Sequence, residues 1–157
     1  MLNNKSIVIE LAQFMVGYPS EPFDWRNNNC CHFVSEWVEH MTEFNPMSGL
    51  AETATVGDAL RLIRSLGGSF RSAWTHRLGV EPVGPERLEI GDVVMFPTAQ
   101  HLGEGCCGVG GLVGICCGDT AAVIDDAGII QHLAMVDAYC GWSLRAVAAE
   151  LAGEVPA

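Results

Sequence analysis

The first half of the chain carries apolar residues at helical spacing. Between residues 4 and 17 they recur three or four positions apart, and a Gly-Tyr-Pro sequence ends the pattern. A cleaner stripe follows, in which apolar residues alternate in steps of three and one: Cys30, Phe33, Val34, Trp37, Val38 and Met41. Asn29 stands where a helix N-cap belongs. Both segments are therefore predicted to be amphipathic helices.

Two further helices are predicted before the pattern of apolar residues changes from helical spacing to short runs. One is capped by Thr55 and ends at Gly67-Gly68, and the other runs from Ser69 to Leu78. The second half instead has short apolar runs between Gly and Asp turns: "DVVMF", "GGLVGICCG", "TAAVID", "GIIQHLAM" and "WSLRAV". Helices followed by short strands predict an α+β fold, with N-terminal helices packed on a small antiparallel sheet.

Length and charge limit the number of domains and the classes of partner that the chain is expected to have. At 157 residues, the chain is predicted to form a single domain spanning residues 1–157. Eight basic residues against nineteen acidic ones give a net charge of −11, which argues against nucleic acid as a partner. No apolar run reaches the roughly 18 residues of a membrane span, so none is expected. The N-terminus lacks a signal-peptide pattern, which predicts synthesis in a cytoplasm with reduced thiols.

Candidate chemistry centres on the adjacent Cys30 and Cys31, which open the second helix. A thiol at a helix N-terminus faces free N–H groups and the positive end of the dipole, and both favour the nucleophilic thiolate. Cys31 lies about 100° further round the helix, so its side chain is predicted to turn away from the site. The alternative is that both cysteines are small buried hydrophobes. Adjacent cysteines lack the C-x2-C spacing of metal sites, so neither a metal nor a cofactor is expected.

A cysteine nucleophile needs a base, and the chain has five histidines: His32, His40, His76, His101 and His132. His32 is predicted to point away from Cys30, and His40 and His76 belong to helix surfaces. His132 lies in a predicted strand and His101 follows another. Only these two are placed to meet a helix N-terminus across a sheet.

Several motifs in order resemble the NlpC-type cell-wall peptidases, a branch of the papain-like cysteine peptidases. "FDWRNNNCCHFVSEWV" resembles their Asp-Cys-Ser-Gly-Phe-Val helix start, with Asn29 in place of the aspartate and Cys30 at the nucleophile. "LEIGDVVMF", "LVGICCG" and "GIIQH" resemble three strands that follow it in that family. The resemblance implies a papain-like fold and a cysteine endopeptidase acting on peptidoglycan, with Cys30 as nucleophile and His132 or His101 as base.

One position departs from that family. Where the peptidases place their catalytic histidine, this chain has Leu112. Either another histidine substitutes, or the fold is retained for assembly and the chemistry is lost.

The short form, with "PFDW" before the cysteine and "GW" near the end, also resembles tail-tip proteins of tailed bacteriophages. This resemblance implies location in the virion tail and binding to tail-tip or baseplate hub proteins. The Gly- and Cys-rich stretch 103–111 could pack on such a partner.

Overall fold

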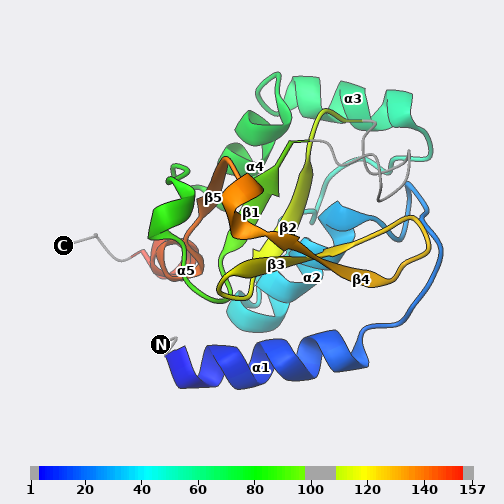
Figure 1. Cartoon of the computed structure of the whole chain (residues 1–157). Helices are drawn as coiled ribbons and strands as arrows, with labels where there is room; N and C mark the ends of the chain where they lie inside the picture. The colour runs from blue at the N-terminus through cyan, green and yellow to red at the C-terminus, as the bar shows by residue number, and fades with distance from the viewer. Residues whose placement is uncertain (1–3, 98–108, 154–157) are drawn as a thin grey trace.

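The computed structural model describes residues 4–97 and 109–153. In these residues the chain is α+β, with five α-helices and a five-stranded antiparallel sheet (Figure 1). The helices are α1 (Asn4–Gly17), α2 (Cys30–Thr42), α3 (Val56–Ser65), α4 (Phe70–Leu78) and α5 (Leu144–Leu151). The strands are β1 (Val93–Phe96), β2 (Leu112–Cys116), β3 (Thr120–Ile124), β4 (Ile130–Ala134) and β5 (Cys140–Trp142). The predicted fold class is confirmed at this level.

The predicted helix starts are confirmed by their caps. The Asn29 side chain accepts hydrogen bonds from the backbone N–H groups of the second and third residues of α2. Thr55 forms a capping box with Asp58 at the start of α3, and Ser69 accepts from the Ser72 N–H at the start of α4. Ser69 is thus the cap of α4 and not its first residue. Each cap satisfies backbone donors that a helix start leaves unpaired.

The apolar run "WSLRAV" is not a single strand, as the sequence had suggested. Strand β5 ends at Trp142, and α5 begins two residues later. Ser143 caps the new helix by accepting from the Ala146 N–H at 3.1 Å. Leu144 and Val147, three positions apart, are both buried, which is helical and not strand periodicity. The division into a helical half and a sheet half is therefore incomplete.

The sheet has the order β4-β3-β2-β1-β5, so β2 is its central strand. Helix α2 packs against β2 and β3, and α1 lies outside α2 (Figure 1). The Phe14 ring of α1 lies 5.5 Å from the Trp37 ring and 5.8 Å from the Phe33 ring of α2. Trp37 also donates its indole N–H to the Gly91 carbonyl at 2.8 Å, just before β1. These contacts hold α2 between α1 and the segment that leads into β1.

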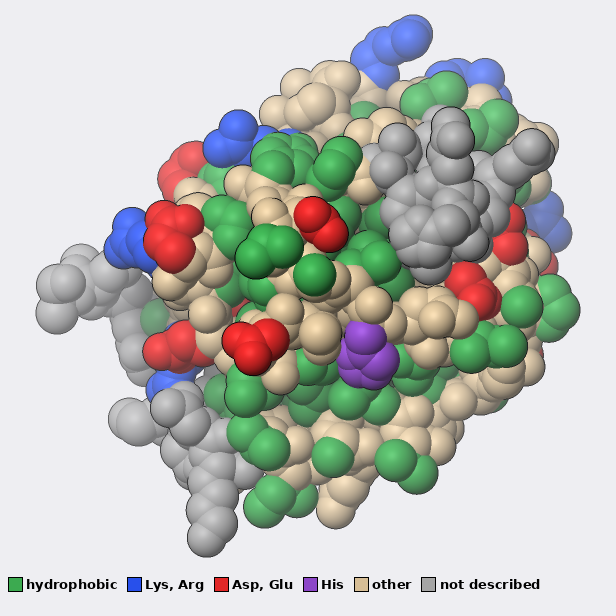
Figure 2. Space-filling view, viewed as in Figure 1, with side chains coloured by type: hydrophobic (Ala, Val, Ile, Leu, Met, Phe, Trp, Pro, Cys, Tyr) green, Lys and Arg blue, Asp and Glu red, His purple; other side chains and the backbone are tan. Residues whose placement is uncertain are grey.

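The surface in front of β4 and β5 carries mixed side chains. Figure 2 shows small hydrophobic groups interspersed with acidic residues on this face, while basic side chains lie near its outline.

Within residues 4–97 and 109–153, no helix combines the length and the apolar character needed to cross a membrane.

Candidate functional site around Cys30

Cys30 is the first residue of α2 and its side chain is buried, with 5% exposure. Cys31 and His32 donate their backbone N–H groups to the Asn29 side-chain oxygen, at 3.0 and 3.1 Å. The cap sets the direction of the first turn and thereby the position of the Cys30 sulfur. The structure therefore places this thiol at a helix N-terminus inside the protein.

The loop before α2 is held by two buried asparagines. Asn29 donates its side-chain amide to the carbonyls of Asp24 and Trp25, at 3.2 and 3.1 Å. Asn28 donates to the Glu21 carbonyl in the same way. Thr53, from the segment before α3, donates its hydroxyl to the Trp25 carbonyl at 2.7 Å.

Of the three side chains that hold this loop, Asn28, Asn29 and Thr53, sequence reasoning identified only Asn29. The run of three asparagines was the signal for Asn28, because buried loop carbonyls need side-chain donors and asparagine supplies two. Thr53 had no such signal, since its partner is distant in the sequence.

The surroundings of Cys30 lower its pKa. A hydrogen bond from the Cys31 thiol contributes most to the shift, and burial opposes it by raising the pKa. The backbone N–H groups of Val113, Cys31 and Cys30 itself add to the lowering, because they stabilise the negative sulfur. The thiolate is the nucleophilic form of cysteine. Cys116, Cys117 and Cys140 behave in the opposite way, because burial raises the pKa of each thiol.

Strand β2 forms the wall beside the thiol through its backbone. The Val113 N–H is directed at the Cys30 sulfur, so the Leu112–Val113 peptide lies against the thiol. Leu112 itself is fully buried in the core. The segment in which a peptidase of the resembled family would carry its histidine thus lies beside Cys30, but it offers an N–H donor and an apolar side chain.

Cys31 does not turn away from the site, contrary to the expectation from its angular position. Its thiol hydrogen-bonds to Cys30, and it lines the same hollow together with Trp25, Met47 and Phe70. The 100° step between neighbouring helix residues therefore does not separate these two side chains. Cys30 and Cys31 are thus a pair of interacting thiols.

Of the two histidines predicted as bases, the structure describes only His132. His132 lies on β4, exposed, with its Nδ1 3.3 Å from the Thr120 hydroxyl. It pairs across the sheet with Ala122 of β3, which in turn pairs with Ile115 of β2. Strands lie about 4.8 Å apart, so the His132 backbone is roughly 10 Å from β2. His101 lies outside the residues that the structure describes, as do Cys106 and Cys107.

His32 lies on the third residue of α2, and its Nδ1 is buried without a hydrogen-bond partner. Burial lowers the pKa of this imidazole, while the charge of Asp24 opposes the shift. The ring is therefore held towards its neutral form.

The described cysteines are free thiols: Cys30, Cys31, Cys116, Cys117 and Cys140. Among the residues described, no three or more His, Cys, Asp or Glu side chains come together in a group that could hold a metal ion. The chemistry that this arrangement offers is that of a sulfur nucleophile.

The fold and site define an α+β domain with a thiol pair at the start of a helix packed on a sheet. A family model described as Domain of unknown function (DUF6950) matches residues 7–144, and the chain belongs to this family. No curated protein and no solved structure matches the chain significantly. The family description states no activity.

Proposed function

We propose that this protein is a cysteine hydrolase of the papain-like NlpC type, carried by a bacteriophage tail tip, that opens peptide bonds in peptidoglycan. One observation carries the proposal: the Cys30 thiol lies at the N-terminus of α2, against β2, with a lowered pKa. A helix-start thiolate is the form of cysteine suited to attack a carbonyl carbon.

In the proposed reaction, the Cys30 sulfur adds to the carbonyl carbon of a stem peptide. The carbon–nitrogen bond breaks, the acyl group stays on sulfur as a thioester, and the amine leaves with a proton. Water then adds to the thioester, giving the carboxylic acid and returning the thiol. A base must carry the proton between these steps, and the resemblance assigns that role to His132 or His101.

The second candidate is a peptidase-like fold that has lost catalysis and serves as a structural subunit of the tail tip. Leu112 favours it, because the position expected to hold the base carries a fully buried apolar side chain. The exposed position of His132, about two strand spacings from β2, supports the same conclusion.

Cleavage of peptidoglycan fragments separates the two candidates. Wild-type protein should release new amino groups from stem peptides, and Cys30→Ala should abolish the release. Cys117→Ala is the matched control, because Cys117 is a half-buried cysteine that does not line the Cys30 hollow, and it should retain activity. If wild-type protein releases nothing and co-purifies with neighbouring tail proteins, the structural role stands and the enzymatic one is wrong.

A further inference from the structure

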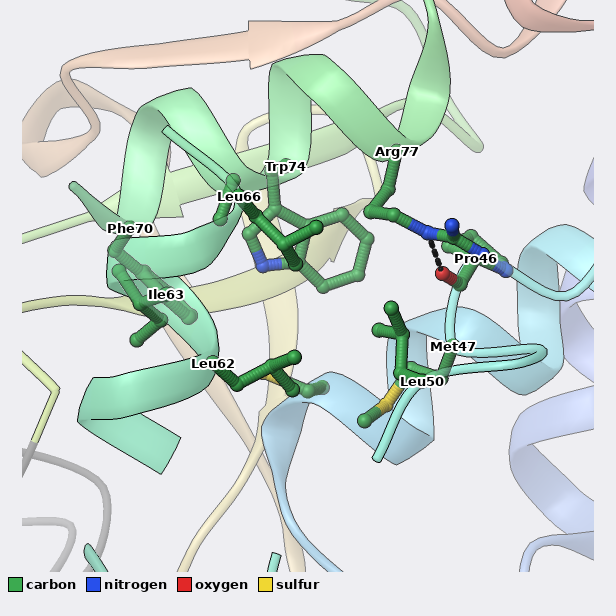
Figure 3. A pocket seen from close by; sticks show the side chains of 11 residues that line it. Pro46, Met47, Leu50, Leu62, Ile63, Leu66, Phe70, Trp74 and Arg77 are labelled. Atoms are coloured by element: carbon green, nitrogen blue, oxygen red, sulfur yellow. Dashed lines mark hydrogen bonds between the residues drawn. The ribbon is translucent and has the colours of Figure 1, made fainter. Parts of the chain in front are cut away.

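An apolar groove extends from the Cys30 thiol between α3, α4 and the loop after α2. Its first part is lined by Cys30, Cys31, Phe23 and Trp25 among others. The second part is lined by Leu66 and Trp74 among others, and Cys30 does not line it (Figure 3). The two parts share one set of walls: Cys31, Met47, Leu62, Ile63 and Phe70. They are therefore adjoining sections of one groove, and Cys30 lines only the first of them.

The walls of the distal section are almost entirely hydrocarbon. Figure 3 shows Trp74 projecting into it from α4 and Leu66 from the turn that ends α3, with Met47 and Leu50 facing them from the loop. Among the residues that the structure describes, Arg77 is the single charged one that lines this section. Its guanidinium donates to the Pro46 and Ser48 carbonyls, at 2.5 and 2.7 Å, and so ties the loop to α4.

A charged or strongly polar group would lose its hydration in this section and find few partners there. An apolar group would instead gain from leaving water, in proportion to the area that the walls cover. The lining of the groove thus favours apolar groups over polar ones, and the Cys30 thiol reacts only with an electrophilic carbon.

We infer that the groove binds an apolar alkyl or side-chain group attached to the carbonyl that Cys30 attacks. This inference rests on the proposed function for the identity of the nucleophile and adds the class of acyl group that it accepts. The carbonyl would lie at Cys30, and the apolar group would extend past Cys31 and Leu62 towards Trp74.

Alkylation of Cys30 by N-substituted maleimides tests the groove without requiring hydrolysis. The sulfur adds to the maleimide double bond, and the resulting carbanion takes a proton from water. N-ethylmaleimide and N-hexylmaleimide differ by four methylenes, and each buried methylene accounts for roughly fourfold in affinity. With partial burial, we expect N-hexylmaleimide to modify Cys30 about tenfold or more faster than N-ethylmaleimide, after normalisation to glutathione. The modified residue is assigned by fragment mass.

Two variants on α3 locate the effect. Leu62→Glu places a carboxylate in the groove wall and should remove the chain-length preference while N-ethylmaleimide still reacts. Leu60→Glu makes the same change at an exposed position outside the groove and should keep the preference. If Leu62→Glu does not fold, protection replaces it: unreactive hexanamide should slow the wild-type reaction with N-ethylmaleimide, and acetamide should not.

A wild-type hexyl-to-ethyl ratio equal to that of glutathione, or absence of protection by hexanamide, would overturn the inference. These results are distinct from failure of the proposed function. A protein that cleaves no peptide can still show the preference, and one that cleaves peptides without the preference keeps its activity but loses this assignment.

Discussion

Strands β2 and β4 belong to the same sheet but differ in what they offer to chemistry. Every residue of β2 is buried, with β1 and β3 on either side and α2 packed against it. Strand β4 is at the edge of the sheet and has no buried residue. The central strand meets Cys30 with a backbone N–H group, while the edge strand holds His132 towards solvent. Proximity to the thiol and availability of a titratable side chain are thus found on different strands.

The largest difference between the strands should be in stability. Leu112→Ala removes a fully buried side chain from β2 and should lower the free energy of unfolding by about 2–5 kcal/mol. Leu133→Ala on β4 removes a side chain that is only half-buried and should cost about 1 kcal/mol. Chemical denaturation of both variants measures the difference. Equal losses would show that β2 is not the better packed strand.

Replacing Leu112 by histidine would give β2, the strand that lies against the thiol, a titratable side chain as well. Leu112→His buries a polar ring next to the residue whose N–H meets the thiol, and it should cost about 1–3 kcal/mol of stability. If the chain is a peptidase that lost its base, this variant should cleave stem peptides faster than wild-type protein, because a positioned base contributes about 100-fold or more. Leu112→Asn controls for polarity without a base. A folded Leu112→His protein with no gain in cleavage would argue against the loss of a base as the sole defect.

The pH dependence of alkylation tests the contribution of the paired thiol. Because the Cys31 hydrogen bond is the largest cause of the lowered pKa of Cys30, Cys31→Ala should raise that pKa. The alkylation rate follows the thiolate, so its midpoint should move to higher pH, and the rate at neutral pH should fall. Cys117→Ala, the matched control, should leave the midpoint unchanged. A pH profile of Cys31→Ala identical to that of wild-type protein would show that Cys31 does not lower the pKa of Cys30.

The parts of this architecture set by local rules could be predicted from the sequence. Asn29, Thr55 and Ser69 mark helix starts because capping depends on residues within one turn. Placement of Cys30 at the start of α2 followed from the same rule. The convergence of Cys31 on Cys30 was missed, because the residues that line the hollow with Cys31, such as Met47 and Phe70, are far away in the sequence. Helix α5 was missed because "WSLRAV" is too short for its period to distinguish a strand end from a helix start.

The smallest effects are expected at His132, on the exposed strand. Its described side-chain partner is the Thr120 hydroxyl, so His132→Ala should change the free energy of unfolding by no more than about 0.5 kcal/mol. Its distance from β2 gives no route to the Cys30 sulfur in this arrangement, so the alkylation midpoint should also stay in place. Gln131→Ala, the neighbouring exposed position, is the control for disturbance of the strand. A cleavage rate reduced about 100-fold in His132→Ala but not in Gln131→Ala would instead assign His132 as the base, and would require β4 to approach Cys30 when substrate binds.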